Sequence, residues 1–212
     1  MSIIMIGGGG HARVLISTLI GKRVKIEGIM VAEQERVGQK VLGCSVIGTD
    51  ADLKRFSPNQ VRLVNGVGNV GKEKNRQNVY VRLKGLGYTF EQVIHPTAMI
   101  AEDVQLSEGV QVMAGSVVQV GTTLGENSII NTKVSVDHDC TIGHDVHLAP
   151  GVTVCGGVCI GSGTFIGAGS TLVPNINIGR NCFIGAGTVV PGDLSDKTRL
   201  TNVSSRASSK TR

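Results

Sequence analysis

Tryptophan is absent from this 212-residue chain, and aromatic residues make up only 3% of it. This scarcity argues against a core filled by large aromatic side chains and favours a narrow interior of small and aliphatic residues. Apolar runs are also short, and none approaches the roughly 20 residues that a helix needs to span a bilayer. We therefore expect no insertion into a membrane.

The cysteines show no recognisable framework. The chain has five of them, without CxxC metal spacing and without the arrangement of a disulfide scaffold. The simplest interpretation is a reduced, cytoplasmic setting. The first six residues lack a basic segment and a cleavage site, so we interpret them as a strand and not as a signal peptide.

The formal net charge is +5, but it forms no basic stripe interleaved with aromatic residues. Nucleic acid is therefore excluded as an expected partner. Much of the excess lies in the last residues: Lys197, Arg199, Arg206, Lys210 and Arg212. A solvated charged surface accounts for it equally well. Residues 193–212 are interpreted as a C-terminal tail, whose serine-rich end beyond Val203 is expected to be frayed.

A six-residue register runs through the second half of the chain. From Ile94 to Val190 every sixth residue is Ile, Leu or Val, at seventeen positions without exception. A second lane, two residues earlier, holds small or β-branched residues. Neither a helix nor a single strand keeps this phase, whereas a β-helix of hexapeptide repeats does. We therefore predict a coil of triangular 18-residue turns over residues 93–192.

Glycine follows the inward aliphatic residue at several corners, for example at Gly125, Gly143 and Gly161. We expect these glycines to supply unusual φ angles at the corners. A purely structural rod is the alternative. It is disfavoured because rods rarely concentrate histidines and acids in one place.

Residues 1–92 show no hexapeptide phase and are predicted to form a Rossmann-like α/β domain. The expected strands cover residues 2–6, about 25–31, 61–67 and 88–93, and the expected helices run to about residue 20 and over 72–86. A run of four glycines before His11 opens the first helix, which makes an anion site because helix N-termini attract phosphate.

The glycine run also satisfies a GxGxxA fingerprint, and Glu33 follows at the spacing of a ribose-binding acid. The unit is too short for a complete NAD domain. A single nucleotide diphosphate is therefore favoured over NAD. A tight turn without a ligand remains the structural alternative.

Three of the five histidines, His138, His144 and His147, fall within ten residues, and none occupies the inward lane. A neutral imidazole is suited to removing a proton near pH 7, and an adjacent carboxylate can fix its tautomer. Asp137 and Asp139 flank His138. A solvated polar corner is one alternative. A metal site is another, although it lacks an obvious third ligand.

Several motifs in this chain resemble the bacterial sugar acyltransferases of the PglD, PerB, WeeI and NeuD type. They are Gly9-Gly10-His11, Gly66-Val67-Gly68-Asn69, Ile94-His95-Pro96, Ile129-Ile130-Asn131-Thr132, Val136-Asp137-His138-Asp139-Cys140-Thr141-Ile142-Gly143 and His147-Leu148-Ala149-Pro150-Gly151. The resemblance extends over about residues 3–192. It implies a left-handed β-helix, a homotrimer with sites between adjacent coils, and acetyl-CoA as co-substrate without a metal.

The resemblance also implies roles for individual residues. His138 is the expected general base, and Asp139 the acid that orients it. On the acetyl-CoA side, His147 contacts the thioester region, the Gly156 N–H stabilises the oxyanion, and Ala168 and Ala186 flank the pantetheine arm. On the sugar side, Asn131 lines the sugar site, and Gly9, His11, Gly68 and Asn69 hold the nucleotide.

The function predicted from these features is N-acetylation of the 4-amino group of a nucleotide-linked aminodideoxy sugar, with a UDP-sugar favoured, in glycan or polysaccharide biosynthesis. Acyl transfer from a thioester needs a base and an oxyanion donor but no protein nucleophile. Two alternatives stay open. One is an O-acetyltransferase for a sugar of the sialic acid type, and the other is a non-catalytic trimer that binds a nucleotide sugar.

Overall fold

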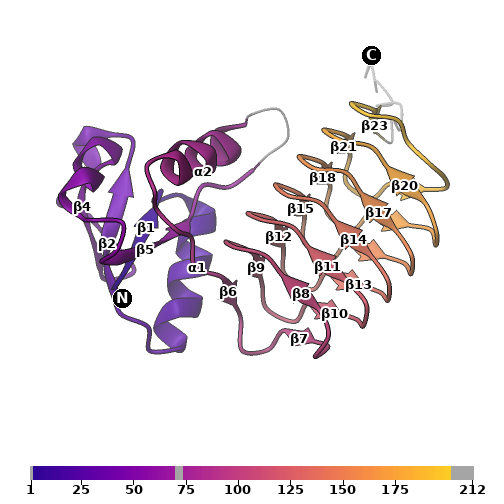
Figure 1. The fold of residues 1–212 in the computed structure, drawn as a ribbon, viewed down its shortest axis with the longest axis horizontal. Coiled ribbons are helices and arrows are strands. Elements are labelled where there is room, and N and C mark those ends of the chain that lie inside the picture. The colour runs from indigo at the N-terminus through magenta and orange to yellow at the C-terminus, as the bar shows by residue number, and fades with distance from the viewer. Residues whose placement is uncertain (1, 70–73, 202–212) are drawn as a thin grey trace, which may run out of the picture.

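The computed structural model describes residues 2–69 and 74–201. It consists of an α/β unit followed by a coil of stacked triangular turns (Figure 1). The predicted fold class, a Rossmann-like domain followed by a left-handed parallel β-helix, is confirmed. Residues 202–212, which include the whole serine-rich end expected to be frayed, lie outside the described residues.

The N-terminal unit contains a five-stranded sheet in the order β3-β4-β2-β1-β5. Its strands are β1 (Ser2–Ile6), β2 (Ile26–Val31), β3 (Lys40–Val41), β4 (Cys44–Thr49) and β5 (Val61–Asn65). Four strands are parallel, and β3 pairs with β4 in the antiparallel sense. The helical segments are α1 (Gly10–Gly21), η1 (Gln34–Arg36), η2 (Asp50–Arg55) and α2 (Asn75–Gly85).

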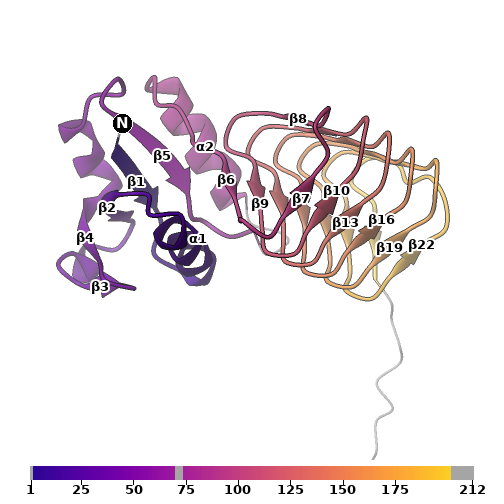
Figure 2. The same cartoon turned by 90° about the horizontal axis from the view of Figure 1, so that it is seen from below.

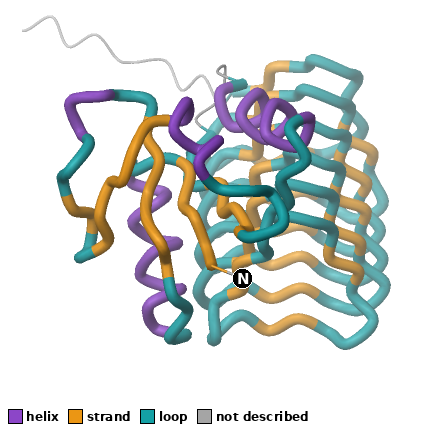
Figure 3. The backbone as a smooth tube through the Cα atoms, turned by 60° about the vertical axis from the view of Figure 1, so that its left-hand side comes forward, coloured by secondary structure: helices purple, strands orange, loops and turns teal. Residues whose placement is uncertain are grey.

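Successive side chains of β1 point to opposite faces of the sheet, and both faces are covered. Ile3 and Met5 pack into the cluster that contains α1, whereas Ile4 and Ile6 pack into the cluster that contains residues of α2. A parallel strand buried on both faces is expected to be a continuous apolar run, which this strand is. Figure 3 shows this sheet and its helices beside the rungs of the coil.

The hairpin of β3 and β4 was not expected from the sequence. Its turn contains Leu42 and Gly43, which both have positive φ angles of 48° and 83°. Such turns usually contain Asn-Gly or Asp-Gly, so Leu-Gly gives a weak signal. The hairpin matters because β4 extends the parallel sheet and its end reaches the candidate site.

The coil is built from two-residue strands on three faces. One face holds β6 (Val93–Ile94), β9 (Gln111–Val112), β12 (Ile129–Ile130), β15 (His147–Leu148), β18 (Phe165–Ile166), β21 (Phe183–Ile184) and β23 (Arg199–Leu200). The second holds β7 (Met99–Ile100), β10 (Val117–Val118), β13 (Ser135–Val136), β16 (Thr153–Val154), β19 (Thr171–Leu172) and β22 (Val189–Val190). The third holds β8 (Gln105–Leu106), β11 (Thr123–Leu124), β14 (Thr141–Ile142), β17 (Cys159–Ile160) and β20 (Asn177–Ile178).

We call these the β6, β7 and β8 faces. The strands of the β7 face lie side by side along the coil in Figure 2. Neighbouring strands are parallel and 18 residues apart, as in the pairing of Ile130 with Leu148. The inward aliphatic residues form one continuous buried core along the coil axis.

The backbone φ angles at the corners differ from one expectation about glycine. The left-handed positions recur every sixth residue from Gly109 to Gly187, and each lies three residues after an inward aliphatic residue. Gly, Asn and Asp occupy nearly all of them, because these residues tolerate left-handed backbone. The glycines directly after the aliphatic residue do not have positive φ.

Those glycines instead allow adjacent turns to approach closely. A Cβ at Gly125 would lie 2.5 Å from the backbone of Gly143, and one at Gly161 would lie 2.6 Å from the carbonyl carbon of Gly179. Atoms cannot approach this closely without displacing the backbone. The absence of a side chain is therefore a packing requirement of this corner.

The coil continues past residue 192, where the six-residue repeat ends. Phe183 pairs with Arg199 and Ile184 with Leu200, so the last turn contains 16 residues between paired positions. The two missing residues shift the phase, which explains why the periodic pattern stops at Val190. Residues 193–201 consequently belong to the last turn of the coil and not to a separate tail.

Buried polar contacts join the two units. Asn65 at the end of β5 donates to Asn127 Oδ1 at 3.1 Å, and Gln111 Nε2 donates to the Asn65 carbonyl at 2.8 Å. Tyr80 of α2 donates to Glu126 at 3.0 Å. These contacts fix the carboxyl edge of the N-terminal sheet against the β6 face. Within the described residues, no helix is long and apolar enough to cross a membrane.

We predict that Gly161→Ala lowers the melting temperature and that Gly192→Ala leaves it nearly unchanged. Overpacking a close-packed interior costs about 1–3 kcal/mol, whereas a Cβ at Gly192 would meet nothing within 4 Å. Scanning fluorimetry of the two variants beside the parent chain measures the difference. Equal melting temperatures for the two variants would contradict the packing role of this glycine column.

Candidate functional site

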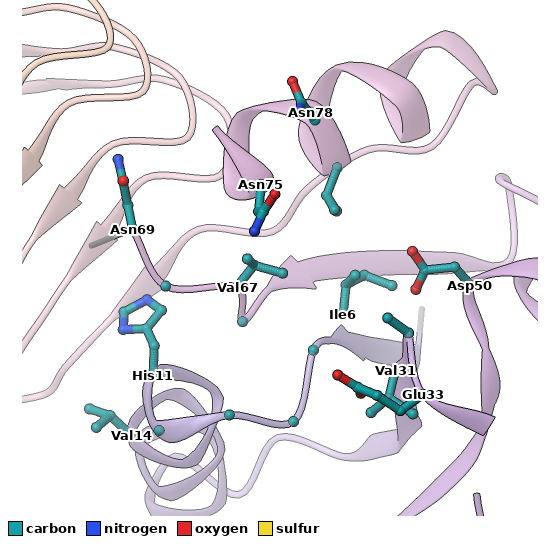
Figure 4. Close-up of a pocket in the computed structure, with 18 of the residues that line it drawn as sticks. Ile6, His11, Val14, Val31, Glu33, Asp50, Val67, Asn69, Asn75 and Asn78 are labelled. Atoms are coloured by element: carbon teal, nitrogen blue, oxygen red, sulfur yellow. The ribbon is translucent and has the colours of Figure 1, made fainter. Parts of the chain in front are cut away.

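A cavity of about 970 Å³ lies at the carboxyl edge of the N-terminal sheet, where it meets the β6 face. We call it the first cavity. Of the residues predicted for the site, it is lined by Gly9, His11, Glu33, Gly68, Asn69, Asn131 and His147. Figure 4 shows His11 and Asn69 at one end of this pocket and Glu33 and Asp50 at the other. Ligands of open parallel α/β sheets bind at this edge.

The glycine loop shapes the floor of the first cavity. Gly7 has a φ of 91° and donates to the Met30 carbonyl at 2.7 Å. A Cβ at Gly8 would lie 2.9 Å from Arg36 Nη2. Gly9 caps α1, whose first turn contains no acidic residue. The first N–H groups of this helix and its dipole therefore make the loop suited to an anion.

His11 is held neutral inside the first cavity. Its Nε2 lies 2.7 Å from Gln111 Oε1, and the Gln111 amide is oriented by its own donation to the Asn65 carbonyl. Nε2 consequently carries the proton and Nδ1 is left as an acceptor. Burial, with the nearby Arg76 charge, lowers the pKa of His11 to about 3.

His147 is also neutral, and its burial differs from the solvated corner considered above. The side chain is 8% exposed, since the N-terminal unit covers the β6 face at this point. Its Nδ1 donates to the Asn69 carbonyl at 2.9 Å, so Nε2 accepts from Asn131 Nδ2 at 3.2 Å. Burial lowers the pKa of His147 to about 4, although the Asn69 bond opposes that shift.

The far end of the first cavity contains residues that the sequence interpretation missed. Asp50 forms an ion pair with Arg82, and Arg36 Nη2 donates to the Gly8 carbonyl at 2.9 Å while its Nη1 lies 3.9 Å from Glu33. Asp50 follows β4 directly. Recognition of β4 as a parallel strand would have indicated Asp50, because strand ends meet at one edge of the sheet.

His138 lies elsewhere, at the corner between the β7 and β8 faces, and does not line the first cavity. Its Nδ1 lies 2.8 Å from Asp139 Oδ2, and the imidazole is more than half exposed. Asp139 occupies a left-handed corner position with a φ of 58°. The Asp139 hydrogen bond, together with the Asp137 charge, raises the pKa of His138.

Gly156 lies one turn above His138. A Cβ at this position would lie 2.6 Å from His138 Nε2, so the imidazole rests directly against the glycine backbone. The next residue, Gly157, donates its N–H to the His138 carbonyl at 2.9 Å. His138, Asp139 and Gly156 therefore form one cluster, as the resemblance implies.

A second histidine–aspartate pair repeats this geometry one corner later. His144 Nδ1 lies 2.8 Å from Asp145 Oδ2, and Asp145 also has a left-handed backbone. Asp145 is 9% exposed, and its other oxygen accepts from Asn127. The Asp145 carboxylate also accepts from Gln77 of α2 and so takes part in the contact between the two units, unlike Asp139.

Ala168 and Ala186 lie apart from the first cavity and from His138, at the exposed corner that follows β18 and β21. Asn131 follows β12 at the same corner, and Gly187 donates to the Ala168 carbonyl at 2.8 Å. A single chain therefore does not bring the Ala168 corner and the His138 corner together, because the β7 face separates them. In residues 2–69 and 74–201, no cluster of three or more His, Cys, Asp or Glu side chains is arranged to hold a metal.

Two family models match the sequence. Residues 2–83 match the PglD N-terminal domain, and residues 121–156 and 157–192 match the bacterial transferase hexapeptide of six repeats. No curated protein sequence matches the chain significantly.

Solved structures resemble nearly the whole chain. A histidine-to-asparagine variant of perosamine N-acetyltransferase from Caulobacter crescentus, in complex with CoA and GDP-perosamine, has 35% identity and a TM-score of 0.88, covering 96% of this chain and 95% of that chain. The acetyltransferase domain of PglB from Neisseria gonorrhoeae, with acetyl coenzyme A, has 31% identity, a TM-score of 0.86 and coverage of 94% and 95%. WeeI from Acinetobacter baumannii shares the fold at 20% identity, with a TM-score of 0.83 and coverage of 94% and 95%.

The identity extends over both units and not over the coil alone. A coil by itself is shared by proteins with many functions, so the combination with the glycine-loop domain is the informative feature. The chain belongs to the bacterial sugar acyltransferases that join a PglD N-terminal domain to a hexapeptide-repeat coil.

Proposed function

We propose that this protein transfers the acetyl group of acetyl-CoA to the 4-amino group of a nucleotide-linked aminodideoxy sugar. The observation that carries the proposal is the likeness over the whole chain to an N-acetyltransferase whose complex contains CoA and GDP-perosamine. The first cavity and the His138 cluster supply the chemistry. The preference for a UDP-sugar stays a prediction, and the test below compares UDP-, GDP- and dTDP-linked sugars.

The first cavity receives the nucleotide sugar in this proposal. The diphosphate lies on the glycine loop at the start of α1, where helix N–H groups favour an anion. Glu33 and Asp50 face the nucleoside, and His11, Asn69, Asn131 and His147 surround the sugar at the end nearer the coil. Because both histidines are neutral, they can hydrogen-bond to sugar hydroxyls without adding positive charge beside the sugar amine.

His138 is the proposed general base. The amine nitrogen attacks the thioester carbonyl, a C–N bond forms, and His138 Nε2 takes the proton from nitrogen. The C–S bond then breaks, and the proton passes to the thiolate that leaves. Asp139 keeps Nδ1 protonated, which leaves Nε2 as the acceptor. The Gly156 N–H stabilises the oxyanion of the tetrahedral intermediate.

A homotrimer would complete the site. His138 and the first cavity lie on opposite edges of the β7 face, so one chain cannot present both to one substrate. The outward residues of that face are uncharged: Met99, Val117, Ser135, Thr153, Thr171 and Val189. Such a face supports association between coils, with His138 of one chain opposite the cavity and the Ala168 and Ala186 backbone of its neighbour.

Thiol release from acetyl-CoA tests the function. The acceptors are UDP-, GDP- and dTDP-linked 4-amino-4,6-dideoxy sugars, together with free sialic acid. Release with one nucleotide aminosugar supports N-acetylation and names the substrate. Release only with sialic acid supports the O-acetyl alternative. No release with any acceptor, together with tight binding of a nucleotide sugar, supports the non-catalytic alternative.

We predict that His138→Ala lowers kcat by roughly 10²–10⁴-fold, the usual contribution of a positioned general base. His144→Ala is the matched control, because His144 pairs with an adjacent aspartate in the same way but lies at another corner. It should retain nearly full activity. Size-exclusion chromatography checks that both variants keep the parent assembly. An unchanged kcat in His138→Ala would overturn the assignment of the base.

We further predict that Asp139→Asn moves the acid limb of the pH profile of kcat/KM to lower pH. The base must be neutral, so activity rises as pH passes upward through the His138 pKa. Asp139 raises that pKa, and its removal lowers the pKa again. Asp137→Asn should give a smaller shift in the same direction, because Asp137 contributes through its charge alone. An acid limb at the same pH in Asp139→Asn would contradict this role.

A further inference from the structure

A second cavity, of about 440 Å³, lies between the start of α2 and the last turns of the coil. It is separate from the glycine loop, although Asn69 lines both cavities. Figure 1 shows α2 running alongside the coil. The described residues that line the second cavity include four cations, Lys74, Arg76, Lys197 and Arg199, and a single acid, Asp145.

Arg76 lines this cavity and has one donor without a partner. The side chain is 3% exposed; its Nε donates to the Asn127 carbonyl at 3.2 Å, and Nη1 donates to the Asn65 and Val67 carbonyls at 2.7 and 2.9 Å. Nη2 is buried and has no hydrogen-bond partner in the described structure. A buried donor without a partner is costly, more so when the group is charged.

Asp145 compensates only part of this positive charge, and both of its oxygens already have hydrogen-bond partners. Oδ1 accepts from Asn127 at 2.7 Å, and Oδ2 accepts from Gln77 at 2.9 Å and lies 2.8 Å from His144 Nδ1. Burial lowers the pKa of Arg76 to about 9, while Asp145 raises it, so the guanidinium is charged at neutral pH. The cavity thus retains excess positive charge.

The shortened last turn brings two of the cations to this place. Lys197 occupies a left-handed corner position, with a φ of 62°, and its N–H donates to the Arg180 carbonyl at 2.7 Å. Arg199 lies on β23, 4.2 Å from the centre of the Phe183 ring. A guanidinium over a ring keeps its donors in its own plane, where they fit a phosphate. The start of α2 adds a first turn without acidic residues.

We propose that the second cavity binds the phosphate group of a small phosphorylated molecule, with Arg76 Nη2, Lys197 and Arg199 as its ligands. A phosphate has enough oxygen acceptors to satisfy Nη2 and both exposed cations at once. The site goes beyond the proposed acetyl transfer. It requires neither His138 nor the glycine loop, so its test is independent of activity.

Calorimetric titration with inorganic pyrophosphate tests the site. Lys197→Gln/Arg199→Gln should weaken one binding event by about tenfold or more, since a hydrogen bond to a charged group contributes about 1.5–3 kcal/mol. Lys40→Gln/Lys54→Gln removes the same charge from exposed positions outside the cavity and should bind as the parent chain does. Unfolding curves check that both double variants fold.

The Arg36→Gln variant distinguishes binding at this site from binding at the glycine loop, because Arg36 contacts Gly8 in the first cavity. The pyrophosphate site should survive this change. A titration that is lost in Arg36→Gln but unchanged in Lys197→Gln/Arg199→Gln would overturn the proposal. Two further ligands identify the source of the phosphate. If it is the 3′-phosphate of CoA, the Lys197→Gln/Arg199→Gln variant weakens binding of CoA but not of dephospho-CoA; if it is the CoA diphosphate, binding of both is weakened; if it is a free anion, neither changes.

Discussion

The stacking of inward aliphatic residues is the interaction on which the rest of this protein depends. Each turn buries its apolar layer against the next, which holds the backbone in register at 18-residue spacing. The register in turn fixes the corners, where left-handed positions recur. Asp139 and Asp145 occupy two of these positions, and each carboxylate thereby faces the preceding histidine. The candidate catalytic pair is therefore a consequence of the same geometry that builds the coil.

A buried polar contact provides the second constraint, since it sets the glycine-loop domain against the coil. Asn65, Gln111 and Asn127 bond across the boundary, and Arg76 ties the end of β5 to the same place. Buried polar groups are costly unless they are paired, so such a contact tolerates little rotation of one unit on the other. It places Asn131 and His147 of the coil in the wall of the first cavity.

Three histidines of one chain are placed in different electrostatic environments. Burial lowers the pKa of His11 and of His147, which keeps both neutral beside the proposed sugar, whereas an exposed carboxylate partner raises the pKa of His138. The three histidines differ in pKa because their surroundings differ. Of these three histidines, only His138, the proposed base, has an aspartate partner at the surface.

The coil, its phase, the glycine loop and the family could be predicted from the sequence, because these rest on local periodicity and short motifs. The sequence also indicated that His138 and Asp139 act together, since adjacent residues at a corner need no distant partner. Only the folded structure shows that His147 is buried, that Asp50 and Arg82 line the first cavity, and that Lys197 and Arg199 line the same cavity as Arg76. Those relations depend on long-range packing and on a turn shortened by two residues, which no periodic pattern records.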